Sequence, residues 1–184
     1  QEPGRTRAIT LLGEMKAEEA IPILTNYLKQ DTKTETILSV QYNCIYALNK
    51  IDTQDAINVL EEYGLKHKDN RIILATSRVL IRKKREKVIE VLNGLLNQKN
   101  PEIRYEAAKI LIDNKEKSGI PVLIDLLSNS RYFWLAKADL ENITGERFGD
   151  LPPIVSKKML EEYINKWKTW WEENKDTFKF PEEK

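Results

Sequence analysis

Residues 100–127 read NPEIRYEAAKILIDNKEKSGIPVLIDLL, and this stretch predicts two helices joined by a short polar turn. Asn100 followed by Pro101 is typical of a helix start, because the asparagine side chain can cap the first turn and proline needs no hydrogen-bond partner there. From Ile120 to Leu127, apolar residues recur at three- and four-residue steps, which is the spacing of one helix face. The stretch therefore predicts a helical hairpin.

Both helix patterns recur along the chain. The second pattern occurs four times, and its marker isoleucines are spaced 36, 32 and 31 residues apart: Ile21, Ile57, Ile89 and Ile120. The first pattern occurs five times, and its marker leucines are spaced 36, 32, 31 and 29 residues apart: Leu12, Leu48, Leu80, Leu111 and Leu140. We name these the isoleucine series and the leucine series. Two interleaved series that stay in step predict an array of two-helix units.

The leucine series carries small residues that would let neighbouring helices approach closely: Ala8, Cys44, Ala47, Ala107, Ala108 and Ala136. No stretch alternates apolar and polar residues long enough to predict a strand. No apolar run approaches the roughly 18 residues that a membrane-spanning helix needs. We therefore expect an all-α fold, a right-handed α-solenoid (α-α superhelix) of about five stacked helical hairpins.

The unit length, the I-P-x-L opening at 21–24 and 120–123, and the small residues of the leucine series, taken as the second helix of each unit, resemble HEAT-like repeats of the short variety found in phycobilisome-lyase relatives. The resemblance covers about residues 5–143. The sequence departs from the repeat at the turn RKKREK, residues 82–87, and through extra residues around 30–36.

The C-terminal part differs from the repeats. We expect a Gly/Pro loop at 144–153, a capping helix at 154–175 and a tail at 176–184, all within a single repeat domain of residues 1–184. The helix has an apolar stripe of Val155, Met159, Tyr163, Trp167 and Trp171, broadened by Leu160 and Ile164. LENITGERFG and WKTWWEENK resemble the closing segment of many bacterial HEAT-like proteins, and a solenoid needs such a terminal unit to cover its last apolar face. The four tryptophans are thus interpreted as core and cap.

The composition excludes several kinds of catalytic or metal-binding site. The formal net charge is +1, and the chain has one cysteine and one histidine, which excludes an internal disulfide and a site with several histidine ligands. Cys44 is interpreted as a buried packing residue and His67 as a solvated turn residue. We expect no catalytic residues, no metal and no cofactor, and hence no enzyme.

Aligning the leucine-series helices exposes two columns of residues that commonly anchor interfaces. Aromatic residues stand six positions before three of the marker leucines, and a tyrosine or a cation stands two positions before three of them. The columns are four residues apart and share one helix face. They consist of Tyr42, Tyr46, Arg78, Tyr105, Lys109 and Trp134. The second helices of HEAT-like pairs line the concave side, so the resemblance implies a concave groove for a protein or peptide. The alternative is that these aromatics bury between helices.

Residues 66–117 carry 14 basic and 7 acidic residues, a basic zone in a chain whose formal net charge is +1. A basic patch lies at its centre: Arg82, Lys83, Lys84 and Arg85. It is either a solvated helix C-terminus or a surface for an acidic or phosphate-bearing partner. Nucleic-acid binding is the alternative function, and the neutral chain argues against it. A phycobilin-lyase activity is suggested by the family resemblance alone.

The predicted function is a non-enzymatic scaffold that binds an unidentified protein or peptide, with an acidic segment favoured by Arg78 and Lys109. We expect a monomer with no membrane span. The closing segment resembles those of exported bacterial proteins, and the chain opens directly on a leucine-series helix, as a mature or trimmed chain would. Export is therefore favoured over a cytoplasmic location.

Overall fold

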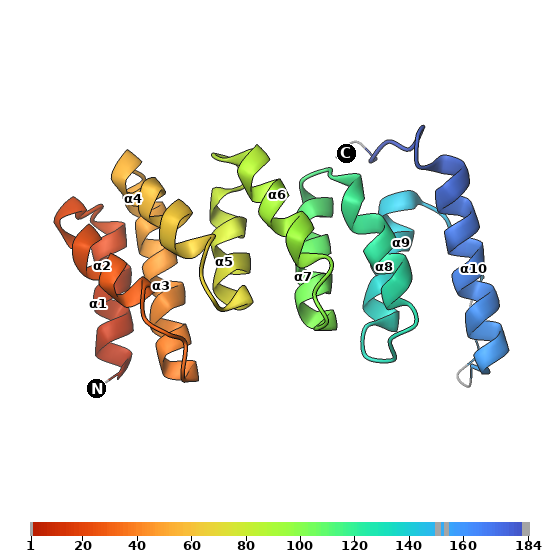
Figure 1. Cartoon of the computed structure of the whole chain (residues 1–184), viewed down its shortest axis with the longest axis horizontal. Helices are drawn as coiled ribbons and strands as arrows, with labels where there is room; N and C mark the ends of the chain where they lie inside the picture. Colours follow the sequence, from red (N-terminus) through yellow and green to blue (C-terminus); the bar gives the residue numbers. More distant parts are fainter. Residues whose placement is uncertain (1, 150–151, 153–154, 182–184) are drawn as a thin grey trace. The chain divides into compact units, whose positions relative to one another are not determined.

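The computed structural model describes residues 2–149, 152 and 155–181, and these residues form helices and turns without any strand. The leucine series forms α1 (Glu2–Glu14), α3 (Glu35–Ile51), α5 (Asn70–Leu80), α7 (Pro101–Asp113) and α9 (Phe133–Thr144). The isoleucine series forms α2 (Ile21–Leu28), α4 (Gln54–Val59), α6 (Arg85–Leu95) and α8 (Ile120–Leu126), and α10 (Lys157–Asn174) follows (Figure 1). The predicted all-α solenoid fold is confirmed.

Several boundaries differ from the prediction. The isoleucine-series helix at Ile57 is α4 followed by a π-helical turn, Leu60–Gly64 (η2), and Gly64 packs directly on Thr76. The turn expected at 82–87 covers residues 81–84, and Arg85 already begins α6. The capping helix begins at Lys157, after the N-cap Ser156, while residue 154 lies outside the described residues.

Helix starts and ends follow local chemistry. The side chain of Asn100 accepts a hydrogen bond from the backbone N–H of Glu102 at 2.9 Å, and Pro101 occupies the first turn, as predicted. Three hairpin turns share a left-handed residue, which stands four positions after its marker leucine: Lys16, Asp52 and Lys115, with φ of 52°, 58° and 64°. A left-handed residue therefore follows each of α1, α3 and α7.

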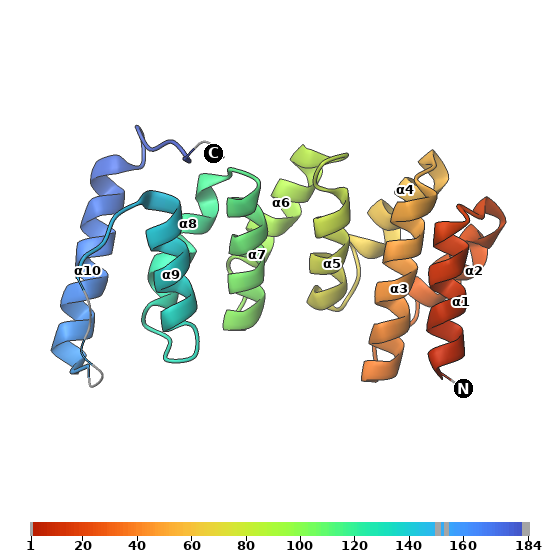
Figure 2. The same ribbon diagram turned by 180° about the vertical axis from the view of Figure 1, so that it is seen from behind.

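The backbone contacts group residues 1–92 into unit 1 and residues 93–184 into unit 2. In unit 1, α3 packs against α1 on one side and α5 on the other, with α2 and α4 packed behind it (Figure 2). In unit 2, α8 packs against α7, α9 and α10. Each unit has its own core, with Leu24, Leu48 and Leu60 fully buried in unit 1 and Leu111, Leu123 and Trp167 fully buried in unit 2.

Small residues allow the close packing of these helices. A Cβ atom added to Gly13 of α1 would lie 2.6 Å from Cα of Ala47 in α3. One added to Gly119 would lie 2.6 Å from the carbonyl oxygen of Ala108. The predicted small residues of the leucine series are fully buried except for Ala8. Ala8 is exposed because no described helix packs on its side of α1.

The apolar stripe of α10 is buried over its C-terminal half. Tyr163, Trp167 and Trp171 are buried, whereas Met159 near the helix start is exposed, so the predicted stripe is too long at that end. The Phe148 ring packs edge-on against Trp167 with centroids 4.8 Å apart. The helix thus covers one side of unit 2 with its aromatic residues.

Candidate protein-interaction surfaces

In unit 1, two of the predicted anchor residues lie on the outer face of α3. Tyr42 is 38% exposed and Tyr46, one helical turn later, is 45% exposed. The Lys50 ammonium lies 5.3 Å from the centroid of the Tyr46 ring, and Arg78 is exposed on the neighbouring α5. We name Tyr42, Tyr46, Lys50 and Arg78 the tyrosine surface.

The burial pattern of α3 explains why the tyrosines face outward. This helix is 17 residues long and is capped by Thr34, whose side chain accepts from the backbone N–H of Ile37. Leu38, Ile45 and Leu48 are buried against neighbouring helices, so the opposite side of the helix must face solvent. A rigid core helix therefore presents the two tyrosine rings.

In unit 2, Tyr105 and Lys109 of α7 meet Asp139 of α9. The Tyr105 hydroxyl donates to Asp139 Oδ2 at 2.7 Å, and Lys109 Nζ lies 3.0 Å from Asp139 Oδ1 and 3.2 Å from Asp113 Oδ1. The Tyr105 ring also lies 5.3 Å from the ring of Tyr132, between centroids. Both predicted anchors are therefore partly buried by contacts within the unit, and Asp139 is a residue that the sequence analysis missed.

These contacts change how the two groups of α7 titrate. Burial, together with the hydrogen bond to Asp139, raises the pKa of the Tyr105 hydroxyl. For Lys109, burial alone would lower the pKa, but the hydrogen bonds and charges of Asp139 and Asp113 outweigh it, and the pKa is raised. Lys109 is thus held as a cation whose charge is already balanced by two carboxylates.

Trp134 is the most exposed of the predicted aromatic anchors. Its side chain is 60% exposed, and Leu135 beside it is 50% exposed, although the sequence analysis placed all four tryptophans in core and cap. The Phe133 ring packs against Trp134 at a centroid distance of 4.9 Å. Trp134 borders a pocket of about 260 Å³. Its lining consists of Leu127, Ser128, Ser130, Phe133, Trp134, Val155 and Leu160. We name Trp134, Leu135 and this pocket the α9 surface.

Two lysines of the basic patch form ion pairs inside unit 1. Lys83 forms an ion pair with Asp52 and donates to Asn49 Oδ1 at 3.3 Å. Lys84 lies 3.6 Å and Lys87 3.1 Å from the carboxylate of Glu61. Arg82 is exposed, and Arg85 lies in the first turn of α6. Because most of these cations have intramolecular partners, the patch offers less charge to a phosphate backbone than its sequence suggests.

His67 is not the freely solvated residue that the sequence analysis expected. Its Nδ1 accepts from the backbone N–H of Asp69 at 3.0 Å, and its Nε2 lies 3.3 Å from the carbonyl oxygen of Gln30. Beside it, the fully buried Gln41 donates to the same Gln30 carbonyl at 2.7 Å and accepts from the Thr32 hydroxyl at 2.7 Å. These bonds fix the loop between α2 and α3, so the role of His67 is structural.

Cys44 is fully buried, as predicted, and burial raises the pKa of its thiol to about 12. No group of three or more His, Cys, Asp or Glu side chains is placed to hold a metal in residues 2–149, 152 and 155–181. Among the same residues, no helix is long and apolar enough to cross a membrane.

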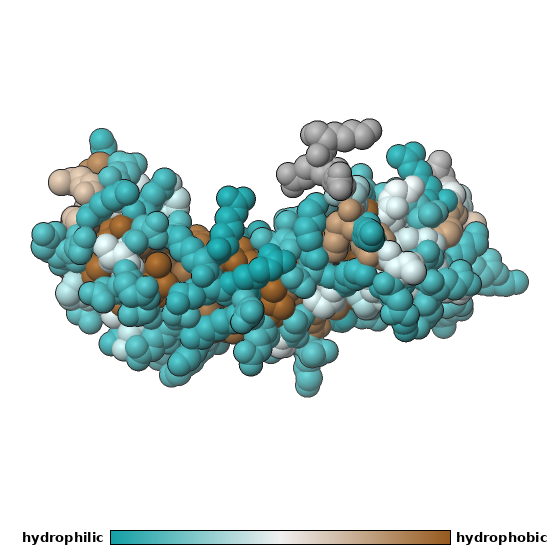
Figure 3. Space-filling model, turned by 90° about the horizontal axis from the view of Figure 1, so that it is seen from above, coloured by the Kyte–Doolittle hydropathy of each residue, from teal (hydrophilic) through white to brown (hydrophobic). Residues whose placement is uncertain are grey.

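The face drawn in Figure 3 shows how polar and apolar residues are distributed over the described helices. On this face hydrophilic residues are the most frequent, and apolar residues are visible between them. Stacked helical hairpins, close glycine contacts and a recurring left-handed turn define an α-solenoid repeat protein.

Comparison with known proteins agrees with this class. Residues 2–77 match the family model described as HEAT repeats. No curated protein and no solved structure matches the chain. Together with the all-helical structure, the match over residues 2–77 supports a HEAT-like repeat protein. Repeats of this family generally serve as scaffolds for protein interactions and are typically not enzymes.

Proposed function

We propose that this chain is a non-enzymatic scaffold that binds a protein or peptide through the exposed faces of its leucine-series helices. Unit 1 contributes the tyrosine surface and unit 2 the α9 surface. The observation that carries the proposal is the contrast between Trp134, which is 60% exposed, and Trp167, which is fully buried. Keeping an indole in water forgoes roughly 25 cal/mol for each Å² of apolar area left unburied, and a partner would recover this free energy.

The chemistry of both surfaces suits interface anchors. Tyrosine and tryptophan offer a large rigid contact area at a small cost in conformational entropy, and they are enriched at the energetic centres of interfaces. The pocket beside Trp134 can take one apolar side chain. On the tyrosine surface, the Lys50 ammonium lies beside the Tyr46 ring, and the exposed Arg78 is on the neighbouring α5. This combination favours a partner segment in which apolar and acidic residues alternate.

Selection from a random peptide display library tests the proposal. Peptides enriched on the wild-type chain are compared on W134A, on the double variant Y42A/Y46A, and on the control M15A. Met15 is 76% exposed and lies outside both surfaces, so M15A controls for nonspecific binding of peptides to an exposed apolar side chain. An anchor residue contributes about 2 kcal/mol or more, and we therefore expect roughly thirtyfold weaker binding in W134A or in Y42A/Y46A.

Unchanged binding in M15A is part of the expected result. If the enriched peptides bind W134A and Y42A/Y46A as tightly as the wild type, neither surface anchors a partner and the proposal is wrong. Circular dichroism of each variant ensures that a loss of binding does not reflect a loss of fold.

A further inference from the structure

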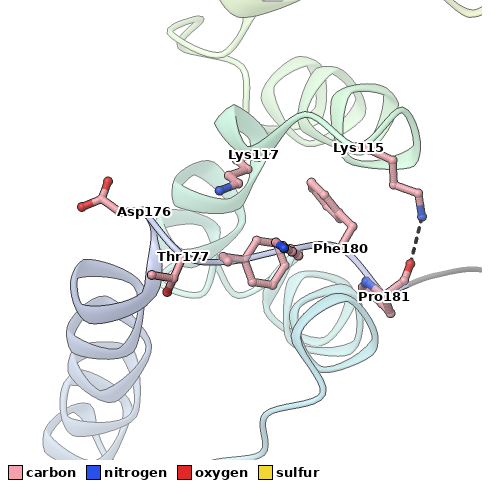
Figure 4. Close-up of a pocket in the computed structure, with 8 residues that line it drawn as sticks. Lys115, Lys117, Asp176, Thr177, Phe180 and Pro181 are labelled. Carbon is pink, nitrogen blue, oxygen red and sulfur yellow. Dashed lines mark hydrogen bonds between the residues drawn. The ribbon is translucent and has the colours of Figure 1, made fainter.

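The segment after α10 folds back over the turn between α7 and α8. Phe178 packs against Trp170 and Trp171, with ring centroids 5.9 and 6.0 Å away, and the Phe180 ring lies 5.2 Å from that of Phe178. Lys115 Nζ donates to the carbonyl oxygen of Pro181 at 3.4 Å (Figure 4). A row of phenylalanine rings and a lysine contact therefore hold this segment in place.

A pocket of about 760 Å³ lies between this segment and the α7–α8 turn. We name it the tail pocket. It is lined by Lys115, Lys117, Asp176, Thr177, Phe178, Lys179, Phe180 and Pro181. The lining combines two aromatic rings with three lysines and one acidic residue, so the pocket offers both an apolar floor and positive charge.

Within the described residues, two of these lysines donate to backbone carbonyl groups. Lys115 donates to the Pro181 carbonyl, and Lys117 Nζ donates to the Lys175 carbonyl at 3.1 Å. Neither forms an ion pair with an acidic side chain in the described parts of the chain. The Asp176 side chain points away from both (Figure 4). Since an ammonium group has three donors, each lysine keeps capacity for an anionic ligand.

The phenylalanine rings complete the recognition chemistry. The Lys115 ammonium lies 5.8 Å from the Phe180 ring centroid, and the Lys117 ammonium lies 6.0 Å from that of Phe178. In Figure 4 the two ammonium groups are separated along the pocket rather than directed at one point. This arrangement suits two carboxylates on either side of an apolar group better than one compact anion such as phosphate.

We propose that the tail pocket binds an acidic peptide segment in which an apolar side chain lies between glutamate or aspartate residues. The carboxylates pair with Lys115 and Lys117, with Lys179 adding charge, and the apolar side chain packs on Phe180. This site shares no residue with the tyrosine surface or the α9 surface, so it is a second site beyond the proposed function.

The probe is a capped peptide with two glutamates on each side of a central leucine, titrated into the full chain by calorimetry. The variant K115Q/K117Q/K179Q removes three positive charges from the pocket. The control K33Q/K66Q/K99Q removes three exposed lysines elsewhere, so the net charge is the same. We expect binding by the wild type and the control, and roughly tenfold weaker binding by the pocket variant. Binding should also weaken as salt is raised.

Two further variants distinguish the tail pocket from the α9 surface and from general anion binding. F180S should lose the preference for the leucine peptide over one with a central serine, whereas W134A should bind the probe like the wild type. The proposal is overturned if both triple variants weaken binding equally, or if the glutamine version of the peptide binds as well. It is also overturned if inorganic phosphate or phosphatidylserine vesicles displace the peptide at equal charge concentration, because the pocket would then bind anions in general.

Discussion

Trp134 and Trp167 carry the same side chain in opposite surroundings, and their variants should differ accordingly. Trp167 is fully buried and packs against Phe148 and Trp170. W167A should therefore lower the free energy of unfolding by about 3–5 kcal/mol. W134A should lower it by less than about 1 kcal/mol, because most of that side chain is already in water. Urea denaturation followed by circular dichroism measures both.

A second substitution sharpens this comparison. Trp167 Nε1 has no hydrogen-bond partner among the described residues. W167F keeps most of the ring packing and loses no hydrogen bond, so it should destabilise less than W167A. Equal losses in W134A and W167A would contradict the assignment of Trp134 to the surface.

Protonation of Asp69 should make the free energy of unfolding depend on pH. Its carboxylate caps α5 and pairs with Arg71 at 2.7 Å, and Arg71 in turn pairs with Glu35 of α3 at 2.9 Å. The hydrogen bond from Arg71 lowers the pKa of Asp69 below its ordinary value of 3.8, against the opposing effect of partial burial. Because the pKa of Asp69 is lower in the folded than in the unfolded state, its carboxylate raises the free energy of unfolding at pH values above the unfolded-state pKa. This contribution is lost as the pH falls through the folded-state pKa.

D69N tests this linkage, because asparagine caps a helix as well as aspartate does but carries no charge. At pH 7 the wild type should be more stable than D69N. The difference should shrink below about pH 4 and vanish at lower pH, as the aspartate becomes protonated. Denaturation curves of both proteins at about pH 7 and about pH 2.5 check this. A difference that is the same at both pH values would show that the charge plays no part.

At the scale of helices, two glycines should respond oppositely to the same substitution. A Cβ at Gly13 would lie 2.6 Å from the backbone of Ala47, so G13A must push α1 away from α3 and should cost about 1–3 kcal/mol. Nothing lies within 4 Å of a Cβ at Gly94 in α6, so G94A should stabilise by about 0.5 kcal/mol through helix propensity. Thermal melts of the two variants give the signs. A higher melting temperature for G13A would refute the close contact.

The helices themselves were largely predictable from sequence, because their signals are local. The marker leucines, the Asn100-Pro101 start and the buried alanines each depend on a few neighbouring residues. The π-helical turn at Leu60–Gly64 was not predicted, and the periodicity does not mark the contact of Gly64 with Thr76 in the next helix.

The candidate surfaces were only partly predictable for the same reason. The column pattern identified Tyr42, Tyr46 and Trp134, which are exposed. It could not show that Tyr105 donates to Asp139, because the partner lies 34 residues away and no sequence periodicity marks it. The tail pocket was also missed, since it forms only where the segment after α10 meets the α7–α8 turn.

At the scale of the whole molecule, the unfolding of unit 1 and of unit 2 should be distinguishable by spectroscopy. All four tryptophans belong to unit 2, whereas circular dichroism reports helices of both units. In W167A, we expect an early unfolding step seen by fluorescence and by circular dichroism, followed by a later step seen by circular dichroism alone. The physical reason is that a repeat contacts only its neighbours, so the loss of packing at α10 reaches unit 1 weakly. Coincident single transitions by both methods would contradict this expectation.

The burial of Cys44 has a practical consequence for handling the protein. Its thiol lies in the middle of α3, out of reach of oxidants and of a thiol on another molecule while unit 1 stays folded. Two chains can therefore become covalently linked only after α3 has opened in both. The fraction of disulfide-linked chains on a non-reducing gel therefore reports how often unit 1 has opened. This fraction should be higher in a sample that has been warmed or stored than in a freshly purified one.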